Sequence, residues 1–278
     1  MLRFAGLCCL LLACDGDPSG PDADPDDLDG DGIANADDNC ARSGNPDQHD
    51  EDRDAFGDAC DNCPTTPNVT QADTTEVAVN AFEDGVGDAC DYRPGLAGDQ
   101  VGAFFSWATP EQMDAWTGTG WTLDSDELRT TGAARWQIKR GETGNGLIVV
   151  AEITALDLSA GPLTISLDGD GINAGLTCTL QQGLGGEELV AREIGGAMDL
   201  VNVSGQNPLI ARSLAAWRRV TLAANELECR IEQGSTKTDA SILLTDDIFT
   251  GTYSLSSSGA SAALSSLIVL TAPGPKNP

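Results

Sequence analysis

The stretch DLDGDGIANADDNC, residues Asp27 to Cys40, decides how the first third of the chain folds. Its five aspartates repel one another, so a stable fold needs water, a basic partner or a metal ion to offset the repulsion. With Asp27 as position 1, oxygen-bearing side chains fall at positions 1, 3, 5, 9 and 12, and glycine falls at position 6. This is the ligand spacing of an EF-hand calcium loop, with aspartate in place of glutamate at position 12. The predicted ligands are Asp27, Asp29, Asp31, the carbonyl of Ile33, Asn35 and Asp38.

A second copy of the loop begins 23 residues later. Its predicted ligands are Asp50, Asp52, Asp54, the carbonyl of Phe56, Asp58 and Asp61. Ala55 stands where the first loop has glycine, so we expect a strained turn and a weaker site. A merely solvated acidic run would not repeat this register, and the pattern therefore favours bound calcium. Magnesium fits less well, because it requires near-octahedral geometry and keeps its waters.

A third copy is interrupted. Asp73 lies 23 residues after Asp50, but seven extra residues, within about 76–82, separate it from the next acidic run. Positions 5, 9 and 12 are kept by Asp84, Asp88 and Asp91. Uninterrupted counting puts Asn80 and Phe82 at positions 1 and 3. Either Asp73 folds back to complete a third calcium site, or that site is lost.

The N-terminus, MLRFAGLCCLLLAC, has one positive charge followed by an apolar run that is too short to span a bilayer. Its end, LLAC, resembles the lipobox of bacterial lipoproteins. The resemblance implies a signal peptide over residues 1–13 and a lipidated Cys14 that anchors the protein in the bacterial cell envelope. The alternative is an ordinary signal peptide cut elsewhere, with Cys14 a spare thiol. Residues 14–26 are mostly Asp, Gly and Pro, which predicts a disordered acidic tether.

The charge of the chain argues against some partners, and its cysteine content agrees with export. The net charge is −29, and residues 15–99 hold more than half of the acidic residues. No basic face exists to neutralise phosphates, which argues against nucleic acid and against charge-driven binding to an anionic membrane surface. Of nine cysteines, Cys8 and Cys9 leave with the signal peptide and Cys14 is the predicted lipidation site. The remaining six predict three disulfides, and sequence alone allows fifteen pairings.

Residues 27–93 resemble thrombospondin type 3 repeats, through DNC at Asp38–Cys40, NPDQ at Asn45–Gln48, the DxDxD of the second loop, and GDACD at Gly57–Asp61. In that family the chain has almost no hydrophobic core and wraps around a row of calcium ions. The resemblance implies the disulfides Cys40–Cys60 and Cys63–Cys90.

The composition changes near Val101, after a linker over residues 94–100. Short apolar runs divided by glycine-rich turns predict an antiparallel β-sandwich over 101–272, followed by a tail at 273–278. The expected strands are Gly146–Leu156, Pro162–Leu167, Leu176–Leu180, Trp217–Leu222, Leu227–Ile231 and Ser266–Leu270. Thr109–Trp116 is expected to form one or two helical turns. Cys178 and Cys229 face inward on their strands and most simply pair, the alternative being two buried free thiols.

This region also resembles concanavalin A-like jelly-roll domains, including laminin G-like modules. The residues that carry the resemblance are Trp116–Thr130, Ala215–Gly234 and Gly251–Leu270. It implies a jelly roll that binds glycan or protein. The five tryptophans could stack on sugar rings, but we expect most of them to fill the core.

Catalytic residues are not expected. Retaining glycosidases need two carboxylates about 5–5.5 Å apart, and the nearest pairs do not fit. Glu226 lacks a suitable third acid, Glu228 is expected to be solvated, and Asp168 with Asp170 reads as a hairpin turn, though a stray calcium is conceivable there. The lone His49 lies inside the repeats.

The sequence therefore predicts an exported lipoprotein with a calcium-rigidified stalk that presents a jelly-roll head. The head would bind glycan or a cell-surface protein in adhesion. The alternatives are a glycan-cleaving enzyme of the concanavalin A-like class and a purely structural envelope protein.

Overall fold

The structure is a computed structural model. It describes residues 25–75, 83–92, 98–138, 146–169, 175–203, 211–220, 225–244 and 252–272. The predicted signal peptide, Cys14, Asn80, Phe82, Asp170 and the tail lie outside these residues. Among the helices that are described, none is long and apolar enough to cross a membrane.

The C-terminal region is built from antiparallel strands, as predicted, with one short 3₁₀ helix. The helix, η2, spans Pro110–Ala115 and confirms the expected turn. The strands are β1 (Gln100–Phe105), β2 (Trp116–Thr119), β3 (Thr122–Asp124), β4 (Glu127–Ile138), β5 (Gly146–Asp157), β6 (Leu163–Leu167), β7 (Leu176–Gly183), β8 (Gly186–Glu193), β9 (Met198–Asn202), β10 (Arg212–Val220), β11 (Asn225–Gln233), β12 (Thr236–Leu243) and β13 (Tyr253–Ala272).

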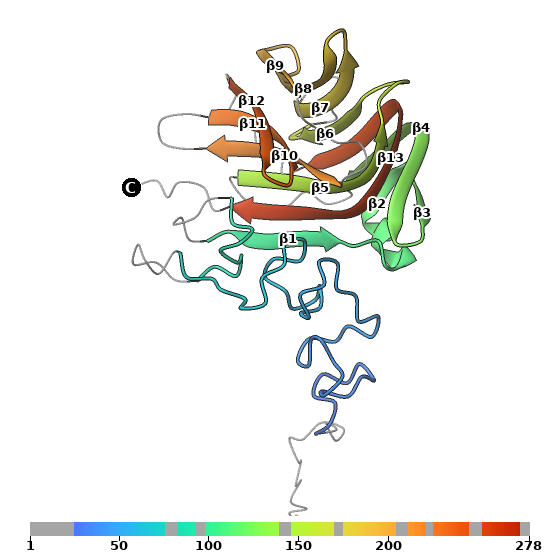
Figure 1. Cartoon of the computed structure of the whole chain (residues 1–278), viewed down its shortest axis with the longest axis vertical. Helices are drawn as coiled ribbons and strands as arrows, with labels where there is room; N and C mark the ends of the chain where they lie inside the picture. Colours follow the sequence, from blue (N-terminus) through green and yellow to red (C-terminus); the bar gives the residue numbers. More distant parts are fainter. Residues whose placement is uncertain are drawn as a thin grey trace, which may run out of the picture.

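The strands form two layers that share the long strand β13 (Figure 1). The first half of β13 pairs with β6 and β4, and this front sheet continues through β7 and β8 to β9. Its second half pairs with β5 and β1, and the back sheet continues through β10 and β11 to β12. Register shifts near Ser258–Ser261 and Leu264 mark where the strand changes layer, since bulges bend a strand. Gly259 is required there, because a Cβ would lie 2.1 Å from the carbonyl oxygen of Ala160.

The core lies between the two layers and follows the alternation of strand residues. On β5, for example, Leu147, Val149 and Ile153 point inward and are almost fully buried. Cys178 on β7 and Cys229 on β11 form a disulfide that joins the sheets, so the predicted pairing is confirmed. Four of the tryptophans are at most 5% exposed, which confirms their expected place in the core: Trp107, Trp116, Trp121 and Trp136.

The outer face of the back sheet is also buried, because the repeats pack against it. Val86 lies with the outward-facing residues of β5, β10 and β13 in a second apolar cluster. Tyr92 packs edge-on against Trp217 of β10, with ring centroids 5.8 Å apart. The buried outer residues of this cluster are Ile148, Val150, Ala215, Ile268 and Leu270.

This packing differs from the expected stalk that holds the head at a distance. In Figure 1 the first repeat extends away from the sandwich, whereas the later repeats lie beneath β1. The side chain of Glu51 in the second repeat is hydrogen-bonded to Ser265 of β13. The expected linker is also hydrogen-bonded to the repeats, since the backbone N–H groups of Gly98 and Asp99 both donate to Asp84 of the third loop, at 2.9 Å each. The repeats therefore cover the sandwich as a third layer.

A carboxyl group lies beneath this layer. Glu152 on β5 is half-buried, and burial, followed by the nearby charges of Glu51 and Glu232, raises its pKa to about 7. A hydrogen bond with Ser213 opposes the shift. The packing of the repeats thus places an acid where its charged form is disfavoured.

The stability of the protein in saturating calcium should respond to Glu152. Because the folded state holds this proton more tightly than the unfolded state, its contribution to stability is lost as pH rises from about 4.5 to about 7. We expect Glu152→Gln to melt several degrees above the wild type at pH 8 and with it near pH 5, followed by circular dichroism. Glu111→Gln, at an exposed site in η2, is the matched control and should melt with the wild type at both pH values. Parallel pH profiles for the wild type and Glu152→Gln would contradict the assignment.

Candidate calcium centres and a front-face groove

The first acidic loop gathers three carboxylates at one point. Oxygen atoms of Asp27, Asp29 and Asp31 all lie within 4.8 Å of one another. The loop is held by its own side chains, because Asp27 accepts the backbone N–H groups of Gly30 at 2.8 Å and Gly32 at 3.0 Å. Asp31 accepts the N–H of Ile33 at 2.8 Å. The side chains at positions 1, 3 and 5 therefore line a concavity of the folded loop.

The second loop repeats this arrangement bond for bond. Oxygen atoms of Asp50, Asp52 and Asp54 again lie within 4.8 Å of one another. Asp50 accepts the N–H groups of Arg53 at 2.7 Å and Ala55 at 3.1 Å, as Asp27 does 23 residues earlier. Two independent stretches of chain thus reach the same local structure from the same residue pattern.

Several carboxylate oxygens in these loops are buried without a hydrogen-bond partner. They are Oδ2 of Asp29, Asp38 and Asp52. A buried polar atom costs free energy unless it is paired. Burial, followed by the charges of Asp61 and Asp54, raises the pKa of Asp52 to about 7. Hard oxygens converging in this way fit a calcium ion, which takes six to eight such ligands.

The remaining predicted ligands lie around these clusters. Asp38 and Asp61, at position 12, each accept the backbone N–H of a cysteine at 2.8 Å. The position-9 residues close their loops: Asn35 Oδ1 accepts the N–H of Leu28 at 3.0 Å, and Asp58 Oδ1 accepts that of Glu51 at 3.0 Å. Ile33 and Phe56 occupy position 7, where each N–H is bonded to the position-5 aspartate.

Asp73 takes position 1 of the third loop. Its Oδ2 accepts the N–H of Gly85 at 2.8 Å, the bond that Asp27 and Asp50 make in the first two loops. Asp73 thus folds back to the loop, whereas the clusters of three carboxylates within the described residues lie in the first two loops. Position 3 is Thr75, which donates to Asp88 at 2.6 Å through Oγ1.

These hydrogen bonds distinguish the third loop from the first two. Hydrogen bonds from Thr75 and Thr74 hold the pKa of Asp88 well below its usual range. Asp84 accepts the N–H of Val86 at 3.1 Å as well as those of Gly98 and Asp99, and Asp91 is half-buried. The third loop thus lacks a carboxylate at position 3 and is tied to the chain that enters β1.

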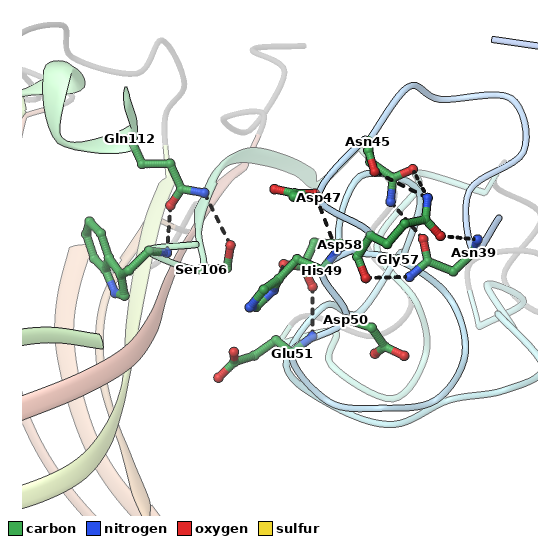
Figure 2. Close-up of polar contacts among 12 residues, drawn as sticks. Asn39, Asn45, Asp47, His49, Asp50, Glu51, Gly57, Asp58, Ser106 and Gln112 are labelled. Carbon is green, nitrogen blue, oxygen red and sulfur yellow. Dashed lines mark hydrogen bonds and ion pairs between the residues drawn. The ribbon is translucent and has the colours of Figure 1, made fainter. Parts of the chain in front are cut away.

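Sequence reasoning missed the amide side chains that hold position 12. Asn45 Nδ2 donates to Asn39 Oδ1 at 2.7 Å (Figure 2). Gln48 Nε2 donates to Asp38 Oδ1 at 2.8 Å. Gly57 fits against this network, because a Cβ there would lie 2.3 Å from Asn39 Oδ1. The signal was available, since Asn62, Asn68, Gln71 and Gly87 form the same contacts one repeat later.

The two disulfides of the repeats are the expected ones. Cys40 pairs with Cys60 and Cys63 with Cys90, each with Cα atoms 5.6 Å apart. Beside the first pair, His49 Nδ1 lies 2.7 Å from Asp58 Oδ2, and this hydrogen bond raises the pKa of His49. Figure 2 shows His49 facing Ser106 and Gln112 of the sandwich.

A groove of about 930 Å³ crosses the outer face of the front sheet, on the side away from the repeats. Its floor follows one register row, in which successive partners are Arg135, Ser256, Thr164, Thr179, Val190 and Leu200. The hydroxyls of Thr164 and Thr179 lie 3.0 Å apart. Further polar lining comes from Thr119, Thr177, Gln181, Arg192, Ser257 and Ser258. The groove therefore offers a line of hydroxyl, amide and guanidinium groups to a ligand.

The carboxylates considered for catalysis lie elsewhere. Glu226 and Glu228 are on β11 of the back sheet, where Glu228 pairs with Arg230 at 3.1 Å. Asp168 lies at the start of the connection between the antiparallel strands β6 and β7, where it is 8% exposed and pairs with the buried Arg218 at 2.7 Å. Among the described residues that line the groove, none is acidic.

Comparison with known protein families identifies the repeats of the N-terminal region. Residues 13–48 and 48–71 match the family model of the thrombospondin type 3 repeat, so the N-terminal region carries such repeats. No curated protein matches the chain.

Solved structures similar to the chain include a legume lectin-like domain, a plant lectin and the exoplasmic/lumenal domain of VIP36. A legume lectin-like domain from Entamoeba histolytica has 13% identity and a TM-score of 0.48, covering 58% of this chain and 92% of that one. The winged bean acidic lectin, complexed with methyl-α-D-galactose, has 8% identity and a TM-score of 0.47, covering 62% and 98%. The exoplasmic/lumenal domain of VIP36, in a Ca²⁺/Man3GlcNAc-bound form, has 11% identity and a TM-score of 0.46, covering 60% and 87%. At such identities a shared fold does not indicate a shared ligand.

The strain at position 6 of the second loop is testable. Ala55 has φ +82°, in the left-handed region that favours glycine. We expect Ala55→Gly to stabilise the calcium-saturated protein by about 1 kcal/mol, because that conformation costs a non-glycine residue about 1–2 kcal/mol. Thermal unfolding in millimolar calcium measures the change.

Ala59→Gly, in the adjoining turn, is the matched control, because Ala59 is not among the described residues with positive φ. It should lose about 0.5–1 kcal/mol, as glycine does where alanine is unstrained. Equal effects of the two substitutions would show that Ala55 is not strained.

Proposed function

We propose that the protein is an exported, calcium-binding lipoprotein whose β-sandwich binds glycans in its front-face groove. The observation that carries the glycan assignment is the row of polar side chains Ser256, Thr164 and Thr179, aligned in register across neighbouring strands. Sugars present many hydroxyls, and a row of donors and acceptors about 4.8 Å apart can bond successive ones. The repeats cover the opposite sheet and leave this face open to a ligand.

The repeats bind calcium in this proposal. The first two loops each bring three carboxylates together and bury oxygens that have no protein partner. A divalent cation would pair those oxygens and offset the repulsion among the aspartates. Since the later repeats pack on β5, β10 and β13, filling the loops would also stabilise the sandwich.

Export and anchoring complete the proposal. Three disulfides within the described residues are typical of an oxidising compartment. The lipobox-like LLAC supports lipidation at Cys14 and a place in the bacterial cell envelope, with residues 14–26 as a tether. A glycan-binding face on an anchored protein serves adhesion to a cell surface or to an extracellular polymer.

Calcium binding is tested at the second loop. Asp52→Asn removes one charge from the cluster, so calorimetric titration should show one fewer calcium ion or a site weakened at least 10-fold. Asp47→Asn, at an exposed aspartate outside the predicted ligand set, is the control and should titrate like the wild type. Equal stoichiometry and affinity in all three proteins would refute a calcium site at Asp52.

Glycan binding is tested at the floor of the groove. Thr179→Val keeps the side-chain shape but removes a hydroxyl, and it should weaken binding to glycans on an array by about 5-fold. Thr122→Val on β3, outside the groove lining, is the control. If no glycan binds the folded, calcium-loaded protein, the structural-protein alternative replaces this proposal; release of reducing sugar would instead favour the enzyme.

A further inference from the structure

The front-face groove has a charge opposite to that of the protein. The chain carries 44 acidic and 15 basic residues, for a net charge of −29. The described lining of the groove nevertheless includes two arginines, Arg135 and Arg192, and no aspartate or glutamate. A ligand in this groove therefore meets a local field unlike that of the rest of the surface.

The two arginines stand at separate strands of the groove. Arg135 is on β4 and Arg192 on β8, with β13, β6 and β7 between them. Four strand spacings of about 4.8 Å place the two positions about 19 Å apart across the sheet. One small anion cannot contact both guanidinium groups over that distance, whereas an extended polymer can.

The acidic side chains nearest to the groove are engaged elsewhere. Glu188, on the adjacent row, accepts a hydrogen bond from Gln181 Nε2 at 3.0 Å and does not line the groove. Asp199 of β9 turns to the back sheet, where it accepts the N–H of Ser241 at 3.1 Å. Arg192 is exposed and forms no ion pair within the described part of the chain. Its guanidinium group is thus available to a ligand.

The Arg192 end of the groove is also apolar. Met198 and Leu200 on β9 line it and are 58% and 42% exposed. No described lining residue is aromatic, so ring stacking on the protein does not provide the affinity. Aliphatic contact with the C–H faces of sugar rings, hydroxyl pairing along the floor and charge pairing at Arg192 remain available.

From these positions we infer that the groove binds an extended anionic polysaccharide, one that carries carboxylate or sulfate groups along its length. This inference rests on the proposed glycan-binding function and specifies its substrate class. Arg192 pairs with one anionic group of the chain. Arg135, which also has an interaction within the protein, attracts a second group about 19 Å away, and Thr164 and Thr179 bond the hydroxyls between them. Guanidinium suits both groups, because its planar donors match carboxylate and sulfate oxygens.

The test compares three oligosaccharide probes on the purified, calcium-loaded protein by calorimetry: a polyuronate, its carboxyl-reduced neutral counterpart, and a sulfated glycan. We expect at least one acidic probe to bind 10-fold or more tightly than the neutral one. Arg192→Gln should weaken that binding about 10-fold, since a hydrogen bond between two charged groups is lost. Arg192→Lys should keep part of the affinity, and Arg135→Gln should weaken binding less than Arg192→Gln, because Arg135 also has an interaction within the protein.

Arg129→Gln is the matched control, because Arg129 is exposed on β4, outside the groove lining, and already paired with Glu127. Arg192 is exposed, so its variant should fold even if Arg135→Gln does not. Equal binding of the acidic and neutral probes, or acidic binding that Arg192→Gln leaves unchanged, overturns the inference while leaving glycan binding in place. No binding of any probe overturns both.

Discussion

The structure depends on how the mutual repulsion of the aspartates in the acidic loops is offset. In each of the first two loops three carboxylates share a space less than 5 Å across, and some of their oxygens are buried without a protein partner. The loops have little apolar surface to offset this cost, so backbone N–H groups, amide side chains and disulfides hold them in shape. What the loops still lack is positive charge, and a hard divalent cation would supply it.

This constraint extends into the sandwich through the later repeats. Val86 and Tyr92 are apolar residues in an otherwise acidic region, and they close over Ile148, Val150 and Trp217 of the back sheet. Strand β5 is consequently buried on both faces, as in a three-layer protein. The outer apolar residues of the back sheet would lie in water if the repeats unfolded. Folding of the repeats and solubility of the sandwich are therefore linked.

The sequence predicted what depends on local spacing. The clustering of positions 1, 3 and 5 in the first two loops follows from residues fixed within one repeat. The disulfides Cys40–Cys60 and Cys63–Cys90 were implied by the resemblance to thrombospondin type 3 repeats, and Cys178–Cys229 was expected because both cysteines face inward on their strands. Whether Asp73 completes the third loop could not be decided, because that depends on the path of an insertion through space. Strands such as β8 and β12 were missed because their inward rows are weakly apolar: the buried end of β8 includes Glu193, and the buried residues of β12 are Ala240 and Ile242.

The docking of the repeats was not predicted, although the sequence carries a sign of it. The run Leu147–Ala151 is apolar without alternation, which is typical of a strand covered on both faces. A strand at the surface of a two-layer sandwich would instead alternate. The groove could not be anticipated in this way, because its floor unites single residues from six strands: the consecutive β6 to β9, and β4 and β13, which are remote from them in the chain.

The acidic loops and the basic groove lie on opposite faces of the sandwich. The acidic loops lie on or beyond the back sheet, and the two arginines of the groove, Arg135 and Arg192, lie on the front sheet. Packed sheets are about 10 Å apart, so the repeats and the groove are separated by more than that distance. The screening length at physiological ionic strength is about 8 Å, which leaves little of the repeats' field at the groove through solvent. Bound calcium would reduce that field further at its source. A strongly acidic protein can in this way carry a face suited to an anionic ligand.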